Sequence, residues 1–136
     1  AFLVKDFKNK HRIQIFNRSP INIKAAKIVG LDTYLLGDLD HLLPHFDLLI
    51  NATSLGHVES SYASPVATRL LTQAKKTLII YDIIYDPIKT ALLKNSEKIG
   101  LRTINGLRMN LVQAVLAYRY TNFTSLSIEK IYQTMK

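Results

Sequence analysis

Cysteine is absent from the 136 residues, and glycine (5) and proline (4) are sparse. Without cysteine there is no disulfide framework and no thiolate metal site, which fits the cytoplasm. No apolar run approaches the roughly 18 to 20 residues of a membrane-spanning helix. The first residues carry two lysines and an aspartate without a cleavage pattern, so they do not resemble a signal peptide. We therefore expect a cytoplasmic protein that does not associate with membranes.

Acidic residues are also few, 10 against 18 basic ones, so the formal net charge is +8. A nucleic-acid-binding surface would gather lysine and arginine on one face with aromatic residues between them. Here the basic residues are scattered along the chain, and we expect no nucleic acid as a partner. Two explanations of the charge remain: a solvated surface, balanced or not by another part of the protein, or a localised anion such as a nucleotide phosphate.

Short β-rich runs alternate with helical stretches, the pattern of an α/β protein with a parallel sheet. The composition, 48% hydrophobic and 21% charged, is that of one globular domain, and we assign residues 1–136 to it. The predicted strands are 12–16, 32–36, 46–51, 77–81 and 101–104, those at 46–51 and 77–81 being buried. The predicted helices are 19–30, 38–43, 64–73, 86–100, 106–120 and 127–135.

Local signals set several of these helix boundaries. Ser19-Pro20 and Ser64-Pro65 each combine an N-cap serine with a proline at the first helical position. Asp86-Pro87 opens another helix, which Gly100 closes, and Pro44 ends a helical turn. Apolar residues recur at helical spacing after Gly106, which predicts an amphipathic helix with this face: Leu107, Leu111, Ala114, Val115 and Tyr118.

The first ten residues resemble the second half of a helix, with no strand before them. A doubly wound sheet places its first strand in the centre and follows it with a Gly-rich phosphate loop. Neither is present. We therefore predict a Rossmann-type doubly wound parallel sheet that lacks its first strand in this chain.

Polar segments follow three of the predicted strands. Asn17-Arg18-Ser19 lies where such sheets recognise the adenosine ribose, and an arginine there accommodates a 2′-phosphate. Asn51-Ala52-Thr53-Ser54 follows a buried strand, where open α/β sheets bind ligands. Each segment has a structural alternative, because Arg18 could be a solvated strand-end residue with Ser19 as a cap, and 51–54 could be a tight polar turn.

A third group follows the strand at 77–81 and the strand at 101–104. Ile83 offers an apolar surface for a nicotinamide ring and Tyr85 a phenol, while Tyr81 favours packing and Asp82 could equally tie down a loop. Gly106 permits close backbone approach. Gln113, on the following helix, could donate to a substrate hydroxyl or carboxylate.

These segments stand in the order and spacing of a known family. Asn-Arg-Ser, Asn-Ala-Thr-Ser, Tyr-Asp-x-x-Tyr and Gly-Leu-x-Met followed by Gln113 extend from about Arg12 to Tyr120. The chain resembles the NADP-binding domain of shikimate dehydrogenases. The resemblance implies an oxidoreductase that reduces 3-dehydroshikimate to shikimate with NADPH in aromatic amino-acid biosynthesis.

The resemblance also implies residue roles. Adenosine 2′-phosphate contacts are implied for Asn17, Arg18, Ser19 and Asn22. The cofactor cleft is implied to be lined by Asn51, Ala52, Thr53 and Ser54, and the nicotinamide end to be contacted by Ile83 and Gly106. Tyr85 and Gln113 match contacts to the substrate, shikimate or 3-dehydroshikimate.

Several positions depart from the family pattern. Arg108 replaces the second glycine of Gly-Leu-Gly-Met, Asn22 stands where some relatives have a second arginine, and Asn110 is polar. The catalytic lysine and aspartate, with the Ser-x-Ser shikimate contacts, are expected in a substrate domain before Ala1. We therefore place no catalytic residue in this chain and expect it to be inactive alone.

Other functions and sites are weaker alternatives. A related nucleotide- or partner-binding module without catalysis is the second interpretation, and a basic RNA-binding domain is a distant third. His41 and His45 have a metal-ligand spacing, but Pro44 breaks the helix that would align them, so no metal site is expected. A homodimer is compatible with the sequence.

Overall fold

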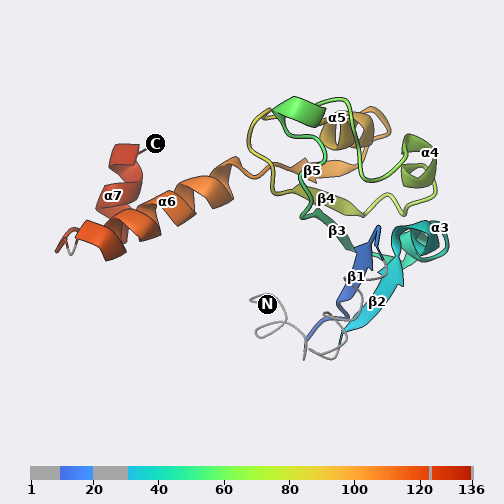
Figure 1. The fold of residues 1–136 in the computed structure, drawn as a ribbon, viewed down its shortest axis with the longest axis horizontal. Coiled ribbons are helices and arrows are strands. Elements are labelled where there is room, and N and C mark those ends of the chain that lie inside the picture. Colours follow the sequence, from blue (N-terminus) through green and yellow to red (C-terminus); the bar gives the residue numbers. More distant parts are fainter. Residues whose placement is uncertain (1–9, 20–30, 123, 136) are drawn as a thin grey trace. The chain divides into compact units, whose positions relative to one another are not determined.

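The computed structural model describes residues 10–19, 31–122 and 124–135. The chain divides into two compact units, Ala1–Pro44 and His45–Lys136, and each is described by itself. Figure 1 labels their elements. Within the described residues, no helix is both long enough and apolar enough to span a membrane.

The first unit contains a two-stranded parallel sheet. Strand β1 (Gln14–Asn17) pairs with β2 (Asp32–Leu35), with Gln14 opposite Asp32. The rings of Phe16 and Tyr34 stack across the pair with centroids 5.4 Å apart. Both predicted strands are confirmed, although β1 begins two residues later than expected. The helix predicted for residues 19–30 falls almost wholly outside the described residues.

A short helical segment follows β2. Helix α3 (Leu39–Leu42) lies between the 3₁₀ turns η1 (Leu36–Asp38) and η2 (Leu43–His45), and Leu39 and Leu43 are buried. Pro44 was expected to end the helical turn, but the turn continues through it to His45. The 3₁₀ geometry tolerates this proline in the last turn.

The second unit contains a three-stranded parallel sheet of order β3-β4-β5: β3 (Leu48–Asn51), β4 (Ile79–Asp82) and β5 (Arg102–Ile104). Its central strand is β4, with Ile80 fully buried, as the apolar run predicted. The expectation of a buried strand at 46–51 was wrong in part, because Leu48 is 48% exposed. In the described part of the chain β3 is an edge strand, which pairs only with β4.

Helix α5 (Ala91–Lys98) packs on one face of this sheet through Leu92 and Leu93 (Figure 1). The helix was predicted to begin at Asp86-Pro87, but it begins at Ala91. Thr90 is its N-cap, and the Thr90 hydroxyl oxygen accepts a hydrogen bond from the Leu93 amide. Gly100 ends the helix at a positive φ of 81°, as expected of a C-terminal glycine.

Helix α4 (Thr68–Leu71) is shorter than the segment 64–73 predicted for it. Ser64 does not cap it. The Ser64 hydroxyl instead donates to the Val66 carbonyl and accepts from the Val66 amide. Serine can form such local turns in place of a helix cap, and here the turn delays the helix to Thr68. Between β3 and α4 lies the 3₁₀ turn η3 (Val58–Ser60).

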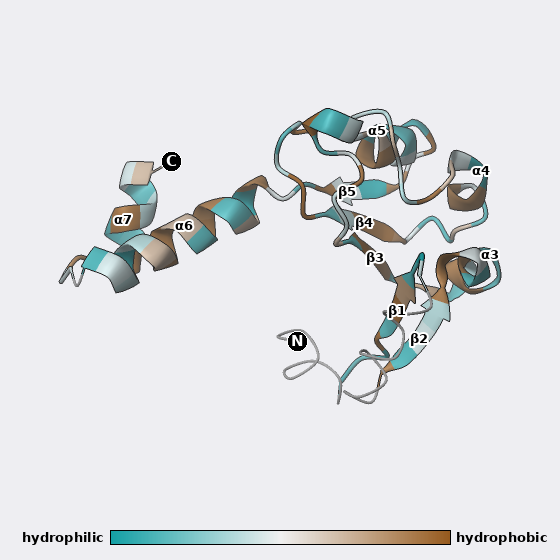
Figure 2. Cartoon of the chain, in the orientation of Figure 1, coloured by the Kyte–Doolittle hydropathy of each residue, from teal (hydrophilic) through white to brown (hydrophobic). Residues whose placement is uncertain are grey.

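Two helices complete the chain, α6 (Leu107–Asn122) and α7 (Ile128–Met135), and they contact each other. Both were predicted. The apolar face expected on α6 is buried only at Val115, with Leu107 and Tyr118 nearly half exposed. Figure 2 shows polar and apolar residues alternating along α6. Helical spacing therefore predicted the helix correctly, but it did not predict that most of the apolar face would stay partly exposed.

Every strand pair in the described residues is parallel. In the doubly wound order 3-2-1-4-5-6, strands two and three are neighbours, and strands four, five and six follow one another. The pair β1-β2 and the series β3-β4-β5 reproduce those two sets of neighbours. The predicted Rossmann-type α/β class is confirmed.

Candidate functional site

The polar segments of the second unit lie at the carboxyl ends of its strands. Asn51 ends β3 and stands opposite Asp82, which ends β4. Ile104 ends β5, and Gly106 follows it directly before α6. Because parallel strands end at one edge of a sheet, the segments that begin at Asn51, Asp82 and Asn105 share that edge.

A buried hydrogen-bond network around Asp82 joins these segments. The fully buried carboxylate accepts from Asn51 Nδ2 (3.1 Å), from the Ile84 amide (3.1 Å) and from the Thr90 hydroxyl (2.7 Å). Thr90 also caps α5. One carboxylate thus holds the end of β3, the segment after β4 and the start of α5.

Sequence reasoning left Asp82 open as a residue that could tie down a loop, and the network shows that it does so. It missed Thr90 altogether. A threonine directly before the apolar run of a helix is an N-cap signal. The helix start was predicted at Asp86-Pro87 instead, because an aspartate followed by a proline is also a helix-start signal.

The side chain of Asn51 shapes the loop that follows β3. Its amide nitrogen also donates to the Leu55 carbonyl (3.1 Å), and its oxygen accepts from the Thr53 amide (3.0 Å) and the Thr53 hydroxyl (2.7 Å). These bonds use the full capacity of a buried asparagine. Ala52, Thr53 and Ser54 remain exposed. Any ligand at this loop would therefore meet residues 52–54, while Asn51 holds them in place.

Gly106 and Ile83 are brought into direct backbone contact. A Cβ atom at Gly106 would lie 1.8 Å from the Ile83 carbonyl oxygen, and the Gly106 amide donates to the Ile84 carbonyl at 3.0 Å. The glycine was expected to permit a close backbone approach, and the group that approaches it is the chain after β4. Two residues with the same predicted role therefore lie side by side.

Tyr85 and Gln113, the two predicted substrate contacts, do not share a cavity. Gln113 lines an open cavity of about 330 Å³ with Tyr81 of β4, Ile104 of β5 and the first residues of α6. Tyr85 is 47% exposed and is not among the lining residues. Tyr81, expected to serve in packing, is half-buried and lines this cavity with Gln113.

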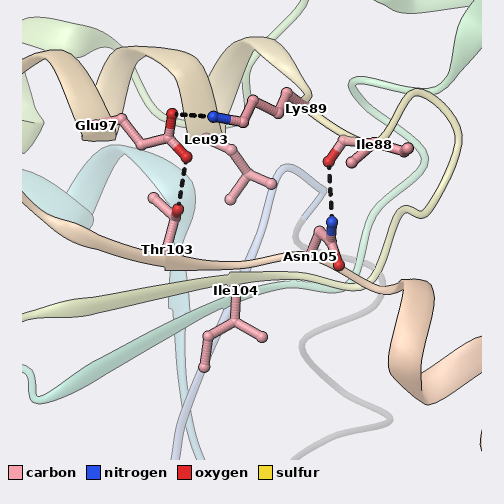
Figure 3. A pocket seen from close by; sticks show the side chains of 7 residues that line it. All are labelled: Ile88, Lys89, Leu93, Glu97, Thr103, Ile104 and Asn105. Atoms are coloured by element: carbon pink, nitrogen blue, oxygen red, sulfur yellow. Dashed lines mark hydrogen bonds and ion pairs between the residues drawn. The ribbon is translucent and has the colours of Figure 1, made fainter.

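A second cavity, of about 320 Å³, lies between α5 and β5 (Figure 3). Glu97 accepts there from Lys89 Nζ (2.7 Å) and from the Thr103 hydroxyl (2.9 Å). The Lys89 bond, followed by that from Thr103, lowers the pKa of Glu97. The two charged residues of this cavity, Lys89 and Glu97, are thus paired with each other (Figure 3).

In the first unit, Asn17-Arg18-Ser19 forms a turn at the carboxyl end of β1. The Ser19 amide donates to Asn17 Oδ1 at 3.2 Å. Arg18 is exposed and makes no hydrogen bond or ion pair within the described residues. Asn22, assigned to the same group, lies outside them.

Parallel strands with helical connections, and polar segments at the strands' carboxyl ends, define a Rossmann-type α/β domain. No family model matches the chain. Among curated proteins, the shikimate dehydrogenase (NADP(+)) of Pyrococcus abyssi is 36% identical over 107 residues, which are 79% of this chain and 39% of that protein. That of Bacillus licheniformis is 38% identical over 123 residues, 88% of this chain and 43% of its own. By sequence, the chain is similar to shikimate dehydrogenases over the part of those proteins that it matches.

Solved structures show the same similarity. Shikimate 5-dehydrogenase from Thermus thermophilus, in complex with NADP(H) and shikimate, matches with a TM-score of 0.72 and 26% identity. The match covers 94% of this chain and 46% of that one. The chain thus spans less than half the length of the relatives it matches.

Proposed function

We propose that this chain is the dinucleotide-binding domain, residues 1–136, of an NADP-dependent shikimate dehydrogenase, which reduces 3-dehydroshikimate to shikimate. The observation that carries the proposal is the position of the shared motifs. Within each described unit, the motif segments lie at carboxyl ends of parallel strands, where α/β sheets of this class bind nucleotides. Their similarity to proteins named as NADP-dependent supports the choice of cofactor.

The turn after β1 fits the adenosine 2′-phosphate. The Asn17–Ser19 bond closes the turn and leaves the Arg18 guanidinium exposed and without a partner in the described residues. A guanidinium binds phosphate through two parallel hydrogen bonds. No carboxylate stands at this strand end, where one would favour NAD. We assign Asn17, Arg18 and Ser19 to this phosphate and extend the assignment to Asn22 from the family pattern.

The sheet edge of the second unit fits the nicotinamide half. Residues 52–54 present small exposed side chains after β3. The backbones of Ile83 and Gly106, which follow β4 and β5 at the same sheet edge, are in direct contact. When bound, the cofactor supplies or accepts the hydride. This chain binds and orients it.

Substrate contacts are assigned to Tyr85 and Gln113, both of which are exposed. Proton transfer requires an acid or base with a suitably placed proton. In the proposed enzyme that role belongs to the family's lysine and aspartate, which lie outside the matched motifs of this chain.

The test is Arg18→Ala in the complete protein, assayed with NADPH and with NADH. Loss of a charge-assisted phosphate contact costs about 1.5 to 3 kcal/mol, so the NADPH Michaelis constant should rise roughly tenfold to a hundredfold while that of NADH stays constant. Arg69→Ala, an exposed arginine outside the motifs, is the matched control. Equal losses with both cofactors would refute the 2′-phosphate assignment, and absence of shikimate turnover by the wild type would refute the function.

A further inference from the structure

The Asp82 carboxylate divides its hydrogen bonds between its two oxygens. Oδ1 accepts from Asn51 Nδ2 and from the Ile84 amide, both at 3.1 Å. Oδ2 accepts from the Thr90 hydroxyl at 2.7 Å. The carboxylate is fully buried, so its orientation depends on these protein donors. Oδ1 is thus bonded to the segments that follow β3 and β4, and Oδ2 to the start of α5.

The bond to the Ile84 amide sets the direction of the Ile83 carbonyl. The two groups belong to one planar trans peptide unit, in which the N–H and the C=O point in opposite directions. Because Oδ1 holds the Ile84 N–H, the Ile83 carbonyl oxygen is turned away from Asp82. That oxygen lies 1.8 Å from the point that a Cβ atom of Gly106 would occupy, and within the described residues it accepts no hydrogen bond. Asp82 thus directs an acceptor that has no partner in the described part of the chain.

Neighbouring bonds hold the same sheet edge together. The Ile83 amide donates to the Asn51 carbonyl at 3.2 Å, and the Gly106 amide donates to the Ile84 carbonyl at 3.0 Å. The Asn51 side chain, bonded to Oδ1, also accepts from the Thr53 amide at 3.0 Å. Oδ1 therefore constrains both segments that the proposed function assigns to the nicotinamide half. Such constraint matters, because a misplacement of about 1 Å can slow a reaction about a hundredfold.

We propose that Asp82 is a positioning residue for hydride transfer, which through Oδ1 orients the Ile83 carbonyl and the loop at 52–54 for the nicotinamide end of the cofactor. The identity of that cofactor rests on the proposed function. Asp82 is fully buried, so it acts through these groups and not by contact with the cofactor. Thr90 differs, because it bonds only to Oδ2 and caps α5, and its role is structural.

The experiment uses variants of the complete protein that keep or remove the acceptor for the Ile84 amide. Asp82→Asn keeps an oxygen for it. The double variant Asp82→Val/Thr90→Val removes it, and because both partners of the Oδ2 bond become apolar, no buried hydroxyl is left unpaired and folding is favoured. Thr90→Val is the matched control, since it breaks only the bond to Oδ2. Titrations compare NADP with adenosine 2′,5′-bisphosphate, which lacks the nicotinamide half.

In the double variant the dissociation constant for NADP should rise about threefold to tenfold, the effect of one lost hydrogen bond, while that for the bisphosphate stays constant. The kcat for shikimate should fall further, by up to about a hundredfold. Hydrogen exchange of the Ile84 amide, measured by NMR without cofactor, should be fast in the double variant. In Asp82→Asn and in Thr90→Val, all of these values should stay close to those of the wild type.

Other outcomes overturn the proposal. Equal losses for NADP and the bisphosphate would mean a general loss of stability. A double variant that matches Thr90→Val throughout, or that exchanges fast with unchanged NADP affinity and kcat, would leave Asp82 a structural role alone. If the wild type binds NADP but does not turn over shikimate, the proposed function fails, and the titrations and the exchange rate still decide the role of Asp82. A wild type that binds no NADP would overturn both.

Discussion

Asp82→Ala should destabilise the protein more than any surface substitution, because it leaves three hydrogen-bond donors without an acceptor. The carboxylate is fully buried and accepts from Asn51, from the Ile84 amide and from Thr90 at 2.7 to 3.1 Å. Each buried donor left unsatisfied costs about 1 to 3 kcal/mol. Asn51 keeps its bond to Leu55, and the Thr90 hydroxyl can rotate, so both should fall at the lower end. We expect a total loss of about 3 to 4 kcal/mol.

Asp82→Asn should cost less, about 1 to 2 kcal/mol, because its oxygen can still accept from Asn51 and from the Ile84 amide while its NH₂ group faces Thr90. Urea denaturation followed by circular dichroism measures both variants. Asp47→Ala is the control, since Asp47 is 91% exposed and its ion pair with Lys75 is a surface pair worth under about 1 kcal/mol. A loss in Asp82→Ala no greater than that of the control would refute the network as a structural element.

A double-mutant cycle measures the hydrogen bond between Asp82 and Thr90. Thr90→Val removes one of the three bonds, and the double variant Asp82→Asn/Thr90→Val completes a mutant cycle. Because Asp82 and Thr90 are in direct contact, the two effects should not add. Additive losses would show that the hydrogen bond between them contributes nothing to stability.

Three further predictions concern single positions. Gly106→Ala should lower both stability and NADP affinity, because its Cβ would lie 1.8 Å from the Ile83 carbonyl oxygen; an unchanged melting temperature and Michaelis constant would contradict the contact. Glu97 has a lowered pKa in the folded state, so its contribution to stability is present above its unfolded pKa and is lost as the pH falls through the folded one. Glu97→Gln should flatten that acid-side decline in unfolding titrations, and an unaltered pH profile would refute it. Tyr85→Phe and Gln113→Ala should each lower kcat/KM for shikimate by an amount that corresponds to about 1 to 3 kcal/mol of activation free energy, without moving the melting temperature. A lower melting temperature with unchanged kcat/KM would make the two residues structural.

Composition and periodicity determined the class of fold. Every described strand was predicted from its run of β-branched and apolar residues, and the strand at 77–81 was correctly placed in the centre of a sheet because its run is continuous. Gly100 marked the end of α5, since it is the residue that enters the left-handed region. These features depend on local backbone preferences, which a single sequence carries.

Residues far apart in the chain decided the rest. Asp82 and Thr90 form one network with Asn51 only because parallel pairing places Asn51 opposite Asp82, and no local pattern encodes that pairing. Tyr81 rather than Tyr85 lines the cavity with Gln113 because strand alternation and the start of α6 together define the cavity. The sequence by itself determined which residue types follow each strand, whereas the tertiary structure decided which of them are buried hydrogen-bond partners and which remain free to meet a ligand, because burial and pairing are properties of neighbours in space.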